Sequence, residues 1–315
     1  MAAACARTVG LILASLVPVA AAGQDLAPRA YFPAPVSSNA IILTYAFAHG
    51  EVLIDPTIPI TDVSGTVHTP VATYYHAFNL AGRSANVTGS VPMPIADFRG
   101  TVVGQDRVAH RAGVGDVVVR LAVNLAGGPA RTPAAFVQAP RFRSLFGASV
   151  KVAAPTGQYD PTRLINIGTN RWAIKPELAY GRRFGRVIVE AYGGVWFFTA
   201  NDDFLASAPG VQGARRTQAP IGAAEFHVSY DVNRRFWISA DLNYWRGGRT
   251  SVNGVAAAES LQANSRYGVT GSLPLARGQS LKISYSGGVV VRVGGNFRVL
   301  SVGWQYGWLG RRFRS

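Results

Sequence analysis

The stretch RFWISADLNYWR, residues 235–246, alternates apolar and polar side chains. Successive side chains of a β-strand point to opposite faces of its sheet, so a period of two predicts a strand with one apolar and one polar face. The apolar parity consists of Phe236, Ile238, Ala240, Leu242 and Tyr244, and the other parity has Ser239, Asp241 and Asn243 at its middle.

The same alternation recurs elsewhere in the chain. It is found in GAAEFHVSYD (222–231), SLKISYSGGVVV (280–291) and DVVVRLAVNL (116–125). Two classes of protein produce it: a barrel that turns its apolar parity to lipid, and a soluble sandwich that turns it to a core.

The composition favours strands over helices. The 315 residues include 35 glycines, 48% hydrophobic and only 15% charged residues, and aromatic and β-branched residues are plentiful. These residue types suit strands joined by turns, so an all-β protein is expected.

The N-terminus has the pattern of an export signal. Residues 1–22 contain one positive charge at Arg7, an apolar run, and three alanines at 20–22 that suit signal-peptidase cleavage. The single cysteine, Cys5, lies within this predicted signal peptide, so the exported chain is expected to have no disulfide and no thiol chemistry. No later segment is apolar for about 18 residues, the length of a membrane-spanning helix.

The rhythm of the connections favours an outer-membrane barrel over a soluble sandwich. Tight turns are expected near 80–83, 183–185, 232–234 and 276–279, and they alternate with long connections at 50–66, 96–114, 155–171, 201–217 and 247–263. Outer-membrane barrels have short periplasmic turns and long outer loops. Two connections break the rhythm: the long GGPARTPAAFVQAPRF (127–142) and the short VGGN (293–296).

We therefore predict a single antiparallel up-and-down transmembrane β-barrel of about twelve strands. A periplasmic segment at 23–38 precedes the barrel at 39–308, and a basic tail at 309–315 follows it. The strands are expected near 39–49, 67–79, 84–95, 115–125, 144–154, 172–182, 186–200, 218–231, 235–246, 264–275, 280–291 and 296–308.

The last strand carries a pattern similar to the C-terminal assembly signal of outer-membrane barrels. Ser301, Gly303, Tyr306 and Trp308 occupy the matching places in SVGWQYGW. This predicts recognition of the strand by the barrel-assembly machinery, although here the tail 309–315 follows the signal.

The whole exported chain resembles the family called putative MetA-pathway of phenol degradation. The most specific string is APTGQYDPTRLINIGTNRWAIKPELAY (154–180), supported by GRSANVTGSVP (82–92), GVGDVVVRLAVNLAGGPA (113–130), APIGAAEFHVSYDV (219–232) and SVGWQYGWLG (301–310). The resemblance implies an outer-membrane barrel of the transporter type. It supplies no catalytic or binding residues to carry over.

The 155–171 connection has two interpretations. Its Pro, Gly, Asp and Asn residues fit a well-ordered outer loop closed by turns. Alternatively, the loop folds over the barrel mouth as a gate lined by Tyr159, Asp160, Arg163, Asn170 and Arg171.

The polar parity of the strands predicts a lumen lined by charges of both signs. The candidates are Asp116, Arg120, Lys151, Lys175, Glu177, Glu190, Glu225, His227, Asp241, Arg266, Lys282 and Arg292. They form either ion pairs that close the barrel or a selective path for a solute. Trp237, Trp245, Tyr192 and Trp196 are either fillers or stacking surfaces for an aromatic solute.

The sequence shows no signature of metal, cofactor or nucleic-acid chemistry. None of the five histidines has metal-binding spacing, and no G-x-S-x-G motif is present. A cross-strand Ser–His pair that uses His76 or His227 stays geometrically open. The net charge of +15 forms no basic cluster interleaved with aromatics, and it suits contacts with lipid phosphates or anions.

The expected function is passive transport of small solutes, aromatic or hydrophobic ones included, through an outer-membrane channel that is not an enzyme and needs no cofactor. The alternative is a plugged structural barrel or an outer-membrane lipid hydrolase. The expected partners are outer-membrane lipids, the assembly machinery and a small-molecule solute.

Overall fold

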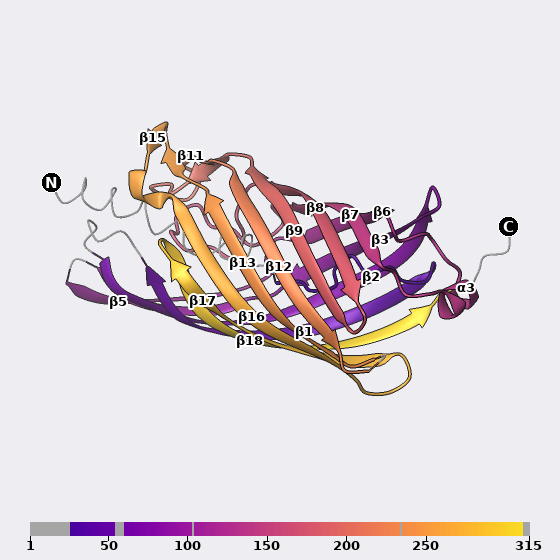
Figure 1. Cartoon of the computed structure of the whole chain (residues 1–315). Coiled ribbons are helices and arrows are strands. Elements are labelled where there is room, and N and C mark those ends of the chain that lie inside the picture. The colour runs from indigo at the N-terminus through magenta and orange to yellow at the C-terminus, as the bar shows by residue number, and fades with distance from the viewer. Residues whose placement is uncertain (1–25, 54–59, 103, 234, 311–315) are drawn as a thin grey trace.

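The computed structural model describes residues 26–53, 60–102, 104–233 and 235–310. Within these ranges, twelve of the fourteen strands in the main sheet close into an antiparallel barrel in the order β1-β18-β17-β16-β13-β12-β9-β8-β7-β6-β3-β2, with β2 pairing back to β1. The predicted all-β barrel is confirmed (Figure 1). The predicted signal peptide 1–22 and most of the tail 309–315 lie outside the described residues.

The barrel strands match the predicted segments closely. Their bounds are β1 (Ser38–Leu53), β2 (Ile60–Leu80), β3 (Arg83–Pro92), β6 (Val118–Ala126), β7 (Ser144–Ala153), β8 (Ala173–Phe184), β9 (Val187–Phe198), β12 (Ile221–Asp231), β13 (Trp237–Gly247), β16 (Gln262–Pro274), β17 (Gln279–Val291) and β18 (Gly294–Leu309).

The first and last strands close the barrel along their whole length. The ladder between β1 and β18 runs from Ser38 opposite Leu309 to Leu53 opposite Gly294. A lipid-facing sheet cannot leave an open edge, because its backbone groups would lack partners in hydrocarbon. The pairing of the chain's two ends therefore makes the structure compatible with a bilayer.

The alternation of side chains is inverted relative to a soluble protein. On β12, Phe226 and Val228 are each 51% exposed on the outside, whereas the alternating residues His227 and Ser229 are fully buried inside. The exposed apolar parity suits contact with lipid chains.

The two ends of the barrel differ. The connections at 81–82, 185–186, 232–236 and 275–278 lie at one end, called here the turn end, and the long connections lie at the other, the loop end. The long 127–143 link, which contains the short helix α3 (Pro133–Gln138), is at the turn end with the end of β18 (Figure 1).

Three of the predicted long loops contain additional strands. β4 (Ile95–Val102) and β5 (Gln105–Ala112) form a hairpin that pairs with the part of β2 beyond the β3 contact. A separate four-stranded sheet at the loop end consists of β10 (Asn201–Phe204), β11 (Ala214–Gln218), β14 (Thr250–Val252) and β15 (Val255–Ala256). The 3-10 helix η1 (Ala258–Ser260) follows it. The four strands of this separate sheet have only two to five residues each, too few to show a period of two in the sequence.

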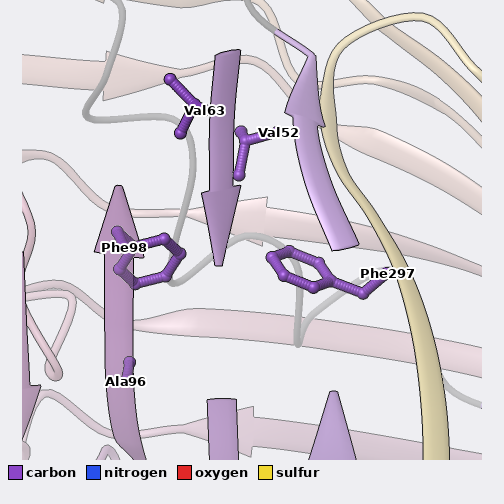
Figure 2. Close-up of a cluster of buried hydrophobic side chains, with 5 residues drawn as sticks. All are labelled: Val52, Val63, Ala96, Phe98 and Phe297. Carbon is purple, nitrogen blue, oxygen red and sulfur yellow. The ribbon is translucent and has the colours of Figure 1, made fainter. Parts of the chain in front are cut away.

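Two apolar clusters line the inner wall towards the loop end. One comprises Val52, Val63, Ala96, Phe98 and Phe297, contributed by β1, β2, β4 and β18 (Figure 2). The other comprises Ala173, Trp196, Ile221, Ala223 and Trp245 on β8, β9, β12 and β13. Within the described residues, no helix is both long enough and apolar enough to cross a bilayer.

The lipid-facing assignment of the outer parity predicts the effect of a charge placed there. Val228→Arg on β12 should lower the free energy of unfolding in lipid vesicles by about 2–4 kcal/mol, because the guanidinium would enter hydrocarbon. Urea titration followed by tryptophan fluorescence measures the change. The control Val211→Arg, in the loop after β10, should leave stability unchanged; equal effects of the two substitutions would contradict the assignment.

Candidate functional site

Residues 26–37, called here the inserted segment, run from the turn end into the barrel lumen. Near the turn end, the backbone N–H groups of Ser37 and Val36 donate to the carbonyls of Ala77 (2.8 Å) and Arg131 (2.9 Å). Further in, Tyr31 is buried against inward-facing residues of β6, β8 and β9. The sequence predicted 23–38 only as a periplasmic segment, so this insertion is new information from the structure.

Glycines in the wall make room for the inserted segment. A Cβ at Gly147 on β7 would lie 2.5 Å from Cδ1 of Tyr31, and one at Gly268 on β16 would lie 2.6 Å from Cδ1 of Leu26. A side chain at Gly147 would force the ring of Tyr31 to move, whereas one at Gly268 would displace only the end of the flexible Leu26 side chain. Gly147 is therefore the closer fit between wall and segment.

Arg29 holds the segment at the turn end of the lumen. Its Nη2 donates to Asp231 (2.7 Å), its Nε donates to Ser229 (3.1 Å), and its guanidinium lies 4.4 Å from the ring centre of Trp237. Asp231 also binds Arg183 and, at 3.2 Å, the half-exposed Arg141. Asp231 is therefore the common anion for three arginines, and Arg29 is the one that belongs to the inserted segment.

Tyr31 is the second contact of the segment. Its hydroxyl donates to Glu177 (2.8 Å) and lies 2.7 Å from the hydroxyl of Ser149. The guanidinium of Arg120 lies 4.4 Å from its ring centre, and the ring of Tyr192 meets it edge-on at 5.1 Å. The contacts of Tyr31 therefore combine hydrogen bonds with packing of its ring against the wall.

Next to the inserted segment, the inner wall of the barrel carries charged side chains that are linked by ion pairs. Lys175 lies between two carboxylates, with Glu177 at 2.5 Å and Glu225 at 3.0 Å. The Nε2 atom of His227 lies 3.6 Å from Glu225, and its Nδ1 lies 2.8 Å from Asp241. These predicted lumen residues do converge, and burial makes each of them depend on its partner.

Two further predicted lumen residues face inward. The Glu190 carboxylate accepts hydrogen bonds from the Tyr192 hydroxyl (2.5 Å) and from the Arg29 backbone (3.1 Å). Arg266 is buried on β16 and donates to the Ser286 hydroxyl at 2.9 Å.

A cavity of about 330 Å³ lies between the inserted segment and the wall. The segment lines one side with Ala27, Pro28, Arg29, Ala30 and Phe32, and the wall contributes Tyr75, Asn86, Thr88, Arg120, Lys151, Glu177, Tyr192, Glu225 and Lys282. This volume is at the small end of the range for ligand pockets.

The structure places two predicted lumen residues elsewhere. Asp116 lies at the loop end, where its carboxylate accepts hydrogen bonds from the backbone of Gly157 (2.9 Å) and from both the backbone (2.9 Å) and hydroxyl (2.6 Å) of Thr169. Asp116 therefore fastens the 155–171 loop. Arg292 follows β17 and pairs with Glu259 at 3.1 Å, half-exposed at the loop end.

The 155–171 loop spans from one wall of the mouth to the other. The Tyr159 hydroxyl donates to the carbonyl of Asp203 (2.9 Å), and the Asn170 amide donates to Asn201 (2.9 Å), which ties the loop to β10. On the opposite side, its Leu164 and Ile165 pack against the apolar cluster of Figure 2.

The other proposed gate residues stabilise the loop. Arg171 is buried, donates to Gln218 (2.5 Å), and lies 4.5 Å from the Phe198 ring centre. Asp160 pairs with the half-exposed Arg163 at 2.8 Å, and hydrogen bonds from Thr162 hold the pKa of Asp160 below its ordinary value.

Histidine contacts bear on the hydrolase alternative. Among the described residues, the hydroxyls bonded to histidine rings are Thr66 to His49 (3.0 Å) and Tyr45 to His68 (2.5 Å), while His76 binds the amide of Asn39 (2.8 Å). In the same ranges, no three His, Cys, Asp or Glu side chains are arranged to hold a metal ion.

Comparisons with known proteins agree on a family and a fold. The family described as “Putative MetA-pathway of phenol degradation” matches residues 51–305. The COG4313 outer membrane channel from Pseudomonas putida F1 is 20% identical with a TM-score of 0.73, covering 90% of this chain and 100% of its own. The beta domain of the Bordetella autotransporter BrkA has 14% identity and a TM-score of 0.53, covering 86% of this chain and 100% of its own. At these identities the likeness shows the fold alone. No curated protein sequence matches the chain.

The buried ion pairs predict a large cost for removing their cation. Lys175→Met should lower the free energy of unfolding by about 3–5 kcal/mol, because Glu177 and Glu225 would stay buried without a cation. Urea titration in lipid vesicles measures it. Arg292→Met, which breaks an exposed pair, should cost at most about 1 kcal/mol; if the two variants were equally stable, the wall charges would not form a coupled network.

The contacts of Asp116 predict that it holds the 155–171 loop in place. Asp116→Ala should make the full-length protein more sensitive to trypsin at the half-exposed Arg163, since three hydrogen bonds to the loop are lost. Mass spectrometry of the fragments reports the cleavage site and its rate. Asp202→Ala, on the exposed face of β10, is the matched control and should leave the rate unchanged.

Proposed function

Because the chain belongs to the family described as “Putative MetA-pathway of phenol degradation”, we propose that its barrel is a passive outer-membrane channel for small solutes, gated by the inserted segment. The observation that carries the proposal is the lumen itself. In its turn end lies a stretch of chain that precedes the first barrel strand and is held through Arg29 and Tyr31, and a cavity remains beside that stretch.

The barrel size agrees with a channel for small solutes. Barrels of eight strands fill their interior with side chains, whereas those of sixteen leave an aqueous channel. A twelve-stranded barrel lies between, so a segment of irregular chain is enough to close it. The P. putida protein of similar fold is named a channel, which supports the same reading here.

The proposed orientation follows the lengths of the connections. Short turns face the periplasm in outer-membrane barrels, so the turn end, where β1 begins and β18 ends, would be periplasmic, and the loop end would face outward. Residues 1–22 would direct export, and the tail 309–315 would extend into the periplasm. The last strand would bring the chain to the assembly machinery through Ser301, Gly303, Tyr306 and Trp308, and the exposed apolar parity would contact lipid.

The alternative is a permanently plugged structural barrel, which the dense pairing around Asp231 and Lys175 favours. A lipid hydrolase has less support. A catalytic triad needs a nucleophile bonded to a histidine that a third group orients, and Thr66 beside His49 has the first of these contacts only. We therefore propose that the protein is not an enzyme.

The two readings differ in what happens when the inserted segment is released. Arg29→Ala removes its ion pair with Asp231 and should raise the single-channel conductance or open probability in planar bilayers several-fold, because the segment loses its main hold on the wall. Deleting residues 26–32 should have a larger effect in the same direction.

The matched control is Arg141→Ala, which removes another arginine from the same aspartate but lies outside the inserted segment. Its conductance should equal that of the unmodified protein. If the barrel stays sealed in both Arg29→Ala and the deletion, the passive-channel proposal is wrong and the plugged barrel stands.

A further inference from the structure

Three cations stand side by side on the inner wall. In the strand register, Arg120 of β6 lies directly opposite Lys151 of β7, and Lys151 lies directly opposite Lys175 of β8. Like charges at directly opposed positions destabilise a sheet, so this row needs anions close by.

The wall supplies carboxylates to one end of the row. Lys175 binds both Glu177 and Glu225. At the other end, Arg120 has no ion pair within the described ranges; one of its nitrogens, Nη1, donates to the carbonyl of Ala30 at 3.4 Å. Its Nη2 is buried without a hydrogen-bond partner, and a buried donor left unpaired costs free energy.

A fourth cation faces the row from across the lumen. Lys282 lies on β17, six places from β7 in the closed order of twelve strands and thus on the opposite wall. Its side chain lines the same cavity as Arg120 and Lys151. Within the described part of the chain, no carboxylate pairs with Lys282.

The charge of the cavity favours an anion. Four cations line it, namely Arg29, Arg120, Lys151 and Lys282, together with the two carboxylates Glu177 and Glu225. The lining is positive, and it stays positive when Arg29 is counted with Asp231 and the two glutamates are counted with Lys175. The glutamates would repel a dianion such as phosphate more strongly than a monoanion.

Much of the remaining lining suits an apolar body, beside the polar Asn86 and Thr88. Tyr75 and Phe32 offer ring surface, and Ala27, Pro28 and Ala30 are apolar. A volume of about 330 Å³ leaves room for a compact molecule of about one ring.

We propose that this cavity is a binding site for a small monocarboxylate with an apolar body, with the carboxylate held by Arg120 and Lys151 and faced by Lys282. An arginine fork matches a carboxylate geometrically and forms charge-assisted hydrogen bonds. The inference rests on the proposed function, since it names the class of solute that such a channel would select.

Benzoate and its neutral isostere benzamide are suitable probes. Equilibrium dialysis of the full-length mature protein, refolded in detergent micelles, should show saturable benzoate binding at one site per barrel and at least tenfold weaker binding of benzamide. Lys282→Gln should weaken benzoate binding about tenfold, the size expected for one charged contact, and Lys282→Arg should keep it.

Arg215→Gln is the charge-matched control, because Arg215 is exposed at the loop end and pairs with Asp202. It should bind benzoate as the unmodified protein does. Equal binding of benzoate and benzamide, unchanged binding in Lys282→Gln, no saturable binding, or equal displacement by chloride at the same concentration would each overturn the proposal.

The binding measurement does not depend on transport. A barrel that conducts after release of the inserted segment but binds no benzoate contradicts this inference alone. A barrel that binds benzoate but stays sealed without the segment contradicts the channel proposal alone.

Discussion

The pairing of β1 with β18 is the interaction on which the rest of the structure depends. In hydrocarbon, a backbone N–H or carbonyl without a partner costs several kcal/mol, so a sheet can cross a bilayer only when its edges meet. The uninterrupted ladder from Ser38 opposite Leu309 to Leu53 opposite Gly294 satisfies that requirement. Closure creates the lumen, which the inward-facing charges line and which the inserted segment and the 155–171 loop partly fill or cover.

In the closed barrel, apolar side chains face outward and polar side chains face inward, the reverse of a soluble protein. Apolar side chains such as Phe226 and Val228 can lie on the outside only because lipid surrounds them, and the polar parity is forced into the interior. Charges in a narrow lumen must find partners. The wall meets that need for Lys175 with two carboxylates and for Asp231 with arginines, and the inserted segment contributes one of those arginines itself.

The inserted segment therefore fills the lumen through polar contacts as well as through packing of its rings. The segment is attached through Arg29 and Tyr31, whose partners are hydroxyls, carboxylates and ring faces. At the opposite end, the 155–171 loop is attached on one side through Tyr159 and Asn170 and on the other through apolar contacts of Leu164 and Ile165, while Asp116 binds it near both of its ends. Between these two closures lies the cavity to which Arg120 and Lys282 contribute their cations.

The sequence by itself determined the fold. The alternation of apolar and polar residues shows which side of each strand faces lipid, and the alternation of short and long connections shows at which end of the barrel each connection lies. It also identified the inward charges, from Arg120 to Lys282, since they occupy the polar parity. Only the tertiary structure decided which of these charges are paired, because partners such as Lys175 and Glu225 are far apart in the sequence and meet through barrel closure. The same holds for Asp116, whose partners come from a loop, and for the inserted segment. Its Arg29 carries no periodic signal and acquires its place in the lumen only from Asp231, which lies 202 residues further along the chain.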